Sequence, residues 1–489
     1  MYGCQEINAK HHFFADQIRK RPMNEDPVVI PRSSWLTLAV TSIAAFMIAI
    51  ETSIISLALP QLRAGFPEAS ESKLSWIVNA YTIGVASLLL VSGWLADRYG
   101  RKRLFFWGLF VFLIASCAAG LAPSANFLIA ARVVQAIGGA MQYPAGLALL
   151  LAAFPPSKIQ TAIGTWGAMG GLAAALGPTL GALLVDAFDW QAVFFINVPV
   201  AALVILFGPK WVAESYSDSI PTKVDLISVP LASLGVGTAI FAITQGNKWG
   251  WSSFGLITSF AIAALLVLAF IVRSQRHPAP LFDLALFKLK TFSVGMIGTL
   301  FFIVAFFAWL ISLPTFIQGT WGWSVLKTGF AIAPGPLLTA FVSPPAGRLA
   351  ERIGNGPLLT IGGILGAGGL TCHLLFTKVE PDYIKGILLP SLLIGFSAGF
   401  GFAQLIGAAM RDVPRDQFGM AGAGRTTIFQ LSLALGVALA FTIIGRPENP
   451  NDALDGLQAT WMMGIGCFVL QTILFAFFGS GEKTKANTS

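Results

Sequence analysis

Two charged residues lie deep inside long apolar segments, where an uncompensated charge is costly. Glu51 lies nine residues before Pro60, roughly 13 Å from the end of its segment at the helical rise per residue. Arg132 lies eight residues after Ser124, at a similar depth of roughly 12 Å in a later segment. A charge near the centre of a membrane helix costs about 2.5–3.5 kcal/mol, so such residues usually face a cavity and serve a function. Because removal from water favours the protonated form of a carboxyl group, Glu51 is a candidate proton carrier.

The two charges could work as a pair. If they face each other, Arg132 would keep Glu51 ionised until substrate binding or a conformational change weakens the contact, because losing one partner of a buried pair is expensive. Two structural alternatives remain open at this point. Glu51 could be held by another neighbour, and Arg132 could bond only to backbone carbonyls.

The most polar stretch between apolar segments runs from Gly93 to Leu104 and reads GWLADRYGRKRL. Its acid, Asp97, can pair with a nearby arginine or with the N-terminus of a neighbouring helix, where a carboxylate is favoured. A glycine in the middle supplies a turn that a side chain would obstruct. We expect this stretch to act as a cytoplasmic gate formed by Gly93, Asp97, Arg98, Gly100 and Arg101.

The gate sequence has a second copy. Residues Gly93–Gly100 and Gly347–Gly354 both read G-x-L-A-acid-R-x-G, with Glu351 as the second acid. Transporter folds are commonly built from two related halves. The repeat therefore predicts two halves.

The composition predicts that most of the chain lies in a bilayer. Of the 489 residues, 55% are hydrophobic and only 11% are charged, whereas soluble proteins carry about 25% charged residues. A spanning helix needs about 20 mainly apolar residues. By that measure we predict an all-α integral membrane protein with fourteen transmembrane helices at residues 35–59, 74–96, 104–122, 125–152, 161–185, 192–212, 226–245, 254–272, 291–313, 325–349, 357–377, 385–409, 420–444 and 457–479.

The basic residues predict the orientation. With the N-terminus inside, 23 of the 31 Lys and Arg residues fall in cytoplasmic segments and seven in external ones, and Arg132 lies within a helix. The cytoplasmic group includes Arg425, near the start of the predicted helix 420–444. By the positive-inside rule, both termini are cytoplasmic.

Several classes of protein are disfavoured. The net charge of +8 is spread over short loops rather than clustered on one face, so we expect no nucleic-acid partner. The four cysteines and four histidines show no ligand spacing, so we expect no metal site and no cofactor. An intramembrane enzyme would need convergent catalytic groups, and a sensor would need a soluble output domain; neither is evident. The polar start predicts a cytoplasmic tail without a cleavable signal peptide, and Met23 is an alternative start.

Together these motifs resemble the major facilitator superfamily, in particular its fourteen-helix drug:proton antiporter branch. The stretch Gly93–Leu104 is similar to the family's signature between helices 2 and 3, and Arg132–Gly138 is similar to its helix 4 motif. The residues GPTLG at 177–181 resemble the antiporter signature. Three positions depart from the usual pattern: Glu51 stands where aspartate is common, Ala182 where glycine is usual and Gln191 where arginine is common.

The resemblance implies two six-helix bundles, 35–212 and 291–479, with two inserted helices at 226–272. The cytoplasmic tails are then 1–34 and 480–489, and the linkers are 213–225 and 273–290. Gly177, Pro178 and Gly181 would form a hinge, because the glycines allow close helix packing and the proline can bend the helix. Plain packing is the alternative reading of the same residues.

The substrate pocket is less evident from the sequence. Its polar and aromatic candidates near the membrane centre are Asn79, Tyr81, Gln142, Tyr143, Gln404 and Gln430. The later helices hold almost no buried acid, which favours lipophilic monocations or neutral amphiphiles over multiply charged cations. We predict a proton-coupled exporter of lipophilic or cationic amphiphilic small molecules, working as a monomer in the cell membrane with small-molecule substrate, protons and lipid as its only partners. A dedicated exporter of one metabolite, siderophore or antibiotic is the alternative.

Overall fold

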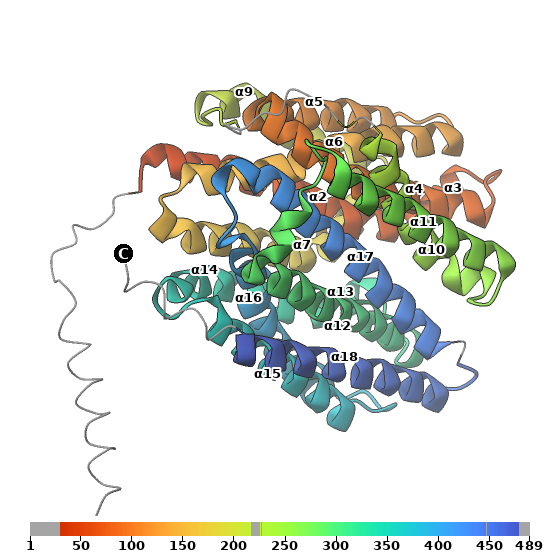
Figure 1. The fold of residues 1–489 in the computed structure, drawn as a ribbon. Helices are drawn as coiled ribbons and strands as arrows, with labels where there is room; N and C mark the ends of the chain where they lie inside the picture. The colour runs from red at the N-terminus through yellow and green to blue at the C-terminus, as the bar shows by residue number, and fades with distance from the viewer. Residues whose placement is uncertain (1–29, 217–224, 226, 446, 479–489) are drawn as a thin grey trace, which may run out of the picture.

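The computed structural model describes residues 30–216, 225, 227–445 and 447–478. Within these residues the chain is helical and contains no strand. Figure 1 shows the helices lying side by side, with the earlier part of the chain in one group and the later part in another.

The first part of the chain forms one group of helices. In chain order these are α2 (Arg32–Leu57), α3 (Leu59–Gly65), α4 (Glu71–Tyr99), α5 (Arg101–Gly120), α6 (Ala125–Ala153), η1 (Pro156–Lys158), α7 (Ile159–Phe188), α8 (Ala192–Phe195), α9 (Asn197–Phe207) and η2 (Gly208–Lys210).

The remainder begins with a helical pair and continues into a second group. In chain order these are α10 (Ser228–Trp249), α11 (Phe254–Arg276), η3 (Leu284–Lys288), α12 (Lys290–Thr320), α13 (Val325–Ile332), α14 (Pro334–Ile353), α15 (Asn355–Phe376), η4 (Ile384–Leu388), α16 (Leu389–Met410), η5 (Arg415–Gln417), α17 (Phe418–Ile444) and α18 (Pro450–Phe478).

Some predicted helices are interrupted. The segment predicted as 192–212 divides into α8, α9 and η2, and the segment predicted as 325–349 divides into α13 and α14. Pro334 is the first residue of α14, a position where proline is tolerated because its missing N–H has no helical partner there. Residues Ala192–Lys210 nevertheless remain long and apolar enough for one span, as predicted.

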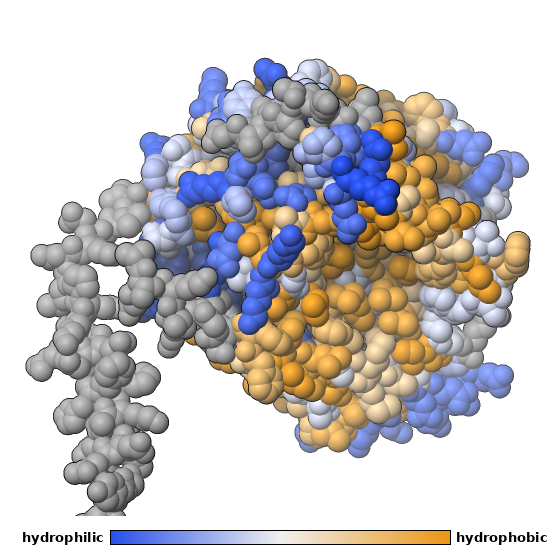
Figure 2. Space-filling model, viewed as in Figure 1, coloured by the Kyte–Doolittle hydropathy of each residue, from blue (hydrophilic) through white to orange (hydrophobic). Residues whose placement is uncertain are grey.

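The protein is a multi-pass membrane protein. Within the described residues, twelve helical segments are long and apolar enough to cross a bilayer. Figure 2 shows a broad hydrophobic surface between hydrophilic groups at either end of the molecule, as a membrane span requires. The long α7 and the α13–α14 pair are not among the twelve, so the count of fourteen stays a prediction.

Glycines at equivalent places end both copies of the repeated motif. Gly100 has φ of +107° between α4 and α5, and Gly354 has φ of +82° between α14 and α15. Glycine adopts this region without the clash that a β-carbon causes. Just after Gly100, the Glu214 carboxylate accepts hydrogen bonds from the backbone N–H groups of Lys102 and Arg103, at 2.8 and 3.2 Å, and so caps the start of α5.

The two groups of helices meet along two seams. In one, α4 packs against α17, and in the other, α7 packs against α14. The pair α10–α11 covers the first seam unequally: α10 packs against both α4 and α17, whereas α11 packs mainly on α10 (Figure 1). The inserted helices therefore leave the α7–α14 seam uncovered.

Candidate functional site

Glu51 and Arg132 form an ion pair in the interior of the first group of helices. The guanidinium of Arg132 contacts the carboxylate of Glu51 through Nη1, and the two side chains are 0% and 1% exposed. Glu51 comes from α2 and Arg132 from α6, and close packing of these two helices brings the two charges together. The similar depths predicted from the sequence are thus matched by direct contact.

The ion pair belongs to a larger buried network. Asn197, the first residue of α9, donates from Nδ2 to the second carboxylate oxygen of Glu51 at 2.6 Å. Arg132 donates from Nε to the Ile77 carbonyl at 3.0 Å and from Nη1 to Oε1 of Gln135 at 2.6 Å. Both oxygens of Glu51 therefore accept charge-assisted or amide hydrogen bonds, an arrangement that suits the ionised carboxylate.

Sequence reasoning missed Asn197 as a partner of Glu51. The residue lies where the predicted helix 192–212 is interrupted, because Pro199 follows two positions later. An amide at the break of an otherwise apolar segment was the available signal. The break is also what starts α9 at Asn197 and places this side chain in the interior, where it is 2% exposed.

A cavity of about 230 Å³ lies between the two groups of helices. Its walls come from α2, α4, α6 and α7 on one side and from α12, α14, α16 and α17 on the other. Most of the surface is apolar and aromatic, as expected for a small-molecule site. Phe306 and Phe402 meet edge to face with ring centroids 5.0 Å apart, and Tyr143 meets Trp166 at 5.4 Å.

Tyr81 connects this central cavity to the ion pair. Its ring lines the cavity, and the guanidinium carbon of Arg132 lies 4.2 Å from the ring centroid. Glu51 itself is not among the residues that line the cavity. In this conformation the carboxylate is therefore shielded from the cavity, with the Tyr81 ring next to it.

Three of the six predicted pocket residues line the central cavity, namely Tyr81, Tyr143 and Gln430. The other three, Asn79, Gln142 and Gln404, do not. Gln142 is buried in α6, and Gln404 on α16 accepts a hydrogen bond from Asn355 of α15 at 2.9 Å. The rotation of each helix about its axis decides which polar residues face the cavity, and the sequence predicts that rotation only approximately.

Arg425 was wrongly counted among the cytoplasmic bases. It is the eighth residue of α17, its side chain is 4% exposed, and it lines the central cavity. The predicted helix 420–444 already contained this position, so the available signal was a base inside an apolar segment.

Asp97 joins the two groups of helices at one end of the molecule. Its carboxylate accepts hydrogen bonds from the backbone N–H groups of Gly419 and Met420 in the first turn of α17, at 3.1 and 2.7 Å. Arg101 donates to Asp97 from Nε at 2.9 Å and to the Arg415 carbonyl from Nη2 at 2.8 Å. A carboxylate at a helix N-terminus satisfies free N–H groups and interacts favourably with the helix dipole.

The second motif copy makes the corresponding contact across the other seam. Glu351, at the end of α14, accepts a hydrogen bond from Thr161 of α7 at 2.5 Å and forms an ion pair with Lys158 at 2.9 Å. Nearby, Asn355 donates to Gln160 at 2.9 Å. Each acid of the repeated motif therefore contacts the start of a helix from the opposite group.

The first glycine of each copy permits this approach. A β-carbon on Gly93 would lie 2.4 Å from the β-carbon of Ala423 and 2.6 Å from the Gly419 carbonyl oxygen. On Gly347 it would lie 2.4 Å from the Gln160 carbonyl oxygen. Both distances are below van der Waals contact, so only glycine fits without a shift of the helices.

The remaining predicted residues have less distinct surroundings. Arg98 of the gate lies over Trp94 and Tyr99, with its guanidinium carbon 5.6 and 5.5 Å from the ring centroids. Gly177 and Gly181 are buried in the continuous helix α7. The side chain of Pro178 lies outside the described residues, so the hinge at Gly177, Pro178 and Gly181 stays a prediction.

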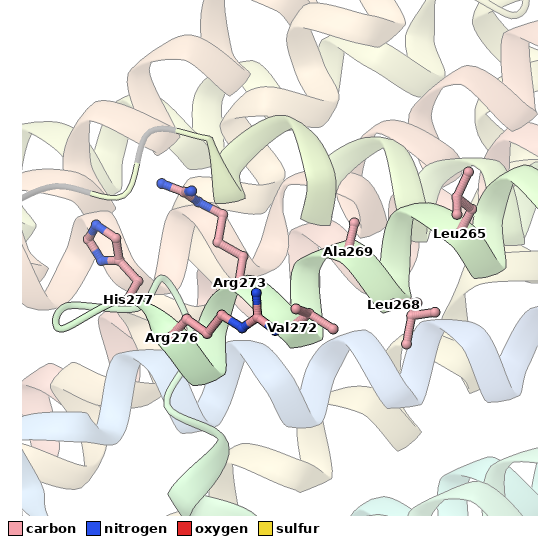
Figure 3. A pocket seen from close by; sticks show the side chains of 7 residues that line it. All are labelled: Leu265, Leu268, Ala269, Val272, Arg273, Arg276 and His277. Carbon is pink, nitrogen blue, oxygen red and sulfur yellow. The ribbon is translucent and has the colours of Figure 1, made fainter.

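A second hollow, of about 510 Å³, lies along α11 (Figure 3). Figure 3 shows Arg273, Arg276 and His277 near one end of the helix and Leu265 and Leu268 further along it. All of its lining residues come from α11 and its C-cap. Because it does not lie between the two groups of helices, it is not a candidate for the transport site.

The chain belongs to the Major Facilitator Superfamily, whose profile matches residues 41–437. It is 33% identical over 419 residues to the multidrug resistance protein Stp of Mycobacterium tuberculosis, covering 85% of this chain and 76% of Stp. It is 29% identical to the tetracenomycin C resistance and export protein of Streptomyces glaucescens, covering 83% and 75%. It is 27% identical to the multidrug export protein EmrB of Escherichia coli K12, covering 89% and 84%.

Solved structures show the same fold. The human organic anion transporter MFSD10 aligns with a TM-score of 0.65 at 14% identity, covering 91% of this chain and 98% of that one. An auto-inhibited peptide transporter of the POT family aligns with a TM-score of 0.57 at 16% identity, covering 94% and 99%. At these identities the likeness establishes the architecture alone.

Proposed function

We propose that this protein is a proton-coupled exporter of lipophilic small molecules across the cytoplasmic membrane. The observation that carries the proposal is the buried ion pair of Glu51 and Arg132 next to a mainly apolar cavity. Family membership supports transport, and the names of the similar proteins, which include drug resistance and export, support the direction and the cargo class.

Glu51 carries the proton in this proposal. Protonation removes its charge, which breaks the ion pair and leaves Arg132 with the carbonyl of Ile77 and the amide of Gln135 as partners. A buried cation that loses its counter-ion is destabilised, so the protonated state favours rearrangement of α2 against α6. Release of the proton restores the pair, and the cycle couples proton entry to export.

The repeated motif is the cytoplasmic gate. Asp97 and Glu351 lie at the predicted cytoplasmic ends of their helices, and their contacts with α17 and α7 close that side. Opening towards the cytoplasm requires both contacts to break as the two six-helix bundles rock about the cavity. The hinge at Gly177, Pro178 and Gly181 would close the opposite side. Both termini are cytoplasmic in this proposal, and the transporter works as a monomer.

A dedicated exporter of one endogenous compound is the second candidate. The small volume of the cavity, about 230 Å³, favours it over a pump that accepts large and diverse drugs. A panel of toxic compounds separates the two: a multidrug pump protects cells against many, and a dedicated exporter against few.

The direct test of export uses proteoliposomes with an acidic lumen. Purified protein is reconstituted and the uptake of neutral, cationic and anionic lipophilic fluorophores is followed with and without a protonophore. Uptake that collapses with the protonophore supports the proposal. Uptake of no fluorophore, or uptake that the protonophore leaves unchanged, contradicts it.

A further inference from the structure

A membrane-buried arginine faces the central cavity, and no ion pair joins it to an acid among the residues that the structure describes. Arg425 is 4% exposed and lines the cavity, and its Nε has no hydrogen-bond partner among the described residues. Its guanidinium carbon lies 5.9 Å from the centroid of the Phe429 ring, one turn further along α17. Tyr143 of α6 lines the same cavity.

Arg132 provides the comparison within the same chain. That arginine is neutralised by Glu51 and bonded to Ile77 and Gln135. No aspartate or glutamate is found among the described residues that line the cavity, so nothing there neutralises Arg425. The lining of the cavity therefore carries one formal positive charge.

The buried guanidinium of Arg425 is suited to bind an anionic group of a ligand. An arginine near the centre of a membrane helix costs about 2.5–3.5 kcal/mol, and such residues normally pair or mark a substrate path. The planar guanidinium offers its N–H donors as a fork that matches a carboxylate in a bidentate contact, and an aryl oxide can accept from it as well. The same charge repels a cation.

The rest of the wall adds a preference for flat rings. Around Arg425, Phe306 and Phe402 meet at 5.0 Å and Phe307 and Phe429 at 5.9 Å, both nearly perpendicular. Aromatic side chains favour stacked or edge-on contact with a planar ligand. The cavity of about 230 Å³ lies just below the range of about 300–1,000 Å³ that is usual for ligand pockets, which favours a small compound.

We propose that the cavity selects planar aromatic anions, with Arg425 binding the carboxylate or phenolate and the phenylalanine cluster packing on the rings. This inference rests on the proposed export function and narrows its cargo from lipophilic compounds in general to those with an anionic group. Arg425 is then a specificity-determining residue that contacts the substrate, whereas Glu51 carries the proton.

The test compares three probes that share one ring system. These are 2-naphthylacetate, its neutral amide and 2-naphthylethylammonium, and their binding to the purified full-length protein is measured by titration calorimetry at pH 7. We expect the acetate to bind at least about 10-fold more tightly than the amide, and the ammonium to bind most weakly. Equal affinities, or preference for the ammonium, overturn the proposal.

Variants assign the preference to Arg425. R425Q is expected to weaken acetate binding at least about 10-fold and to change amide binding by less than about 2-fold. R425K keeps the positive charge but loses the bidentate guanidinium donors. Its preference for the acetate over the amide should therefore lie between those of the wild type and R425Q. K288Q removes an exposed cation of η3 and should bind like the wild type. A preference that survives in R425Q contradicts the assignment. If R425Q does not fold, the order of the three probes' affinities for the wild type and for R425K tests the proposal instead.

Binding requires no proton gradient, so the two proposals fail separately. Anion-selective binding without gradient-driven uptake would contradict export and leave the selectivity standing. Gradient-driven uptake of the ammonium in preference to the acetate would support export and overturn the selectivity.

Discussion

Asp97 and Glu351 occupy the same position in two copies of one motif, and each contacts the start of a helix from the opposite group. Asp97 accepts from the first turn of α17 and Glu351 from Thr161 in the first turn of α7. The two seams between the groups are thus closed at the same end by related contacts. Opening that end requires both to be lost.

Loss of the Asp97 carboxylate should open the gate. In D97N one oxygen becomes an amide group that cannot accept from α17, and the charge that holds Arg101 is gone. Hydrogen bonds to charged groups contribute about 1.5–3 kcal/mol, so the open population should rise about 10- to 100-fold. Spin labels on R103C and R411C, exposed positions in opposite groups, would report this as a longer distance in pulsed electron resonance.

The control for this experiment is D283N. Asp283 caps η3 within its own part of the chain, where it accepts from the Ala285 N–H at 2.8 Å, and it does not bridge the seam. D283N should keep the wild-type distance distribution. If D97N also keeps the wild-type distance distribution, the contact between Asp97 and the first turn of α17 does not hold the gate closed.

Alanine at either motif glycine should impair transport by preventing full closure of one seam. The new β-carbon in G93A or G347A would lie 2.4 Å from atoms of the opposite group, and overpacking of this kind costs about 1–3 kcal/mol. We expect at least about a 5-fold fall in the rate of gradient-driven uptake in proteoliposomes. G466A, where a β-carbon meets nothing within 4 Å, is the matched control. Wild-type rates in both G93A and G347A would show that the seams need no such close approach.

The link between the inserted helices should weaken in acid. Burial raises the pKa of Asp225, but hydrogen bonds from Ser228 and Arg273 outweigh it and lower the pKa below its ordinary value. The stabilisation is therefore complete above the unfolded value of about 3.9 and is lost as the pH falls through the lower folded value. Because Arg273 is 32% exposed, screening limits the contribution to about 1 kcal/mol.

Thermal unfolding in detergent checks this pH dependence. D225N should be less stable than the wild type at pH 7, and the difference should shrink below about pH 4. D455N changes an exposed aspartate of α18 and should match the wild type throughout. A difference between D225N and the wild type that does not change with pH would contradict the assignment.

The sequence predicted those parts of the fold that depend on local composition and on depth. Apolar length placed most helices, and the repeated motif indicated two related halves. Counting residues from the helix ends placed Glu51 and Arg132 at one level, and the structure joins them. None of this required knowledge of how a helix is rotated about its axis.

Features that depend on helix rotation could not be predicted. Gln404 is a predicted pocket residue but faces α15, because it lies two residues from the cavity residues Phe402 and Ile406 and so about 200° around the helix from them. Arg425 belongs to the predicted cytoplasmic bases, although it lines the cavity from the third turn of α17. Pro199 indicates the break before α9, but the contact between Asn197 and Glu51 depends on how α9 is placed against α2, which the local sequence does not specify.

The most direct test of the central claim is gradient-driven uptake by E51Q. Proteoliposomes with an acidic lumen are compared for the wild type, E51Q and E68Q, in which the altered acid is an exposed loop residue. Glutamine cannot exchange a proton, so E51Q should lose accumulation against a gradient while still allowing downhill exchange of the same probe, and E68Q should resemble the wild type. Accumulation by E51Q at the wild-type rate would contradict the claim that Glu51 couples proton entry to export.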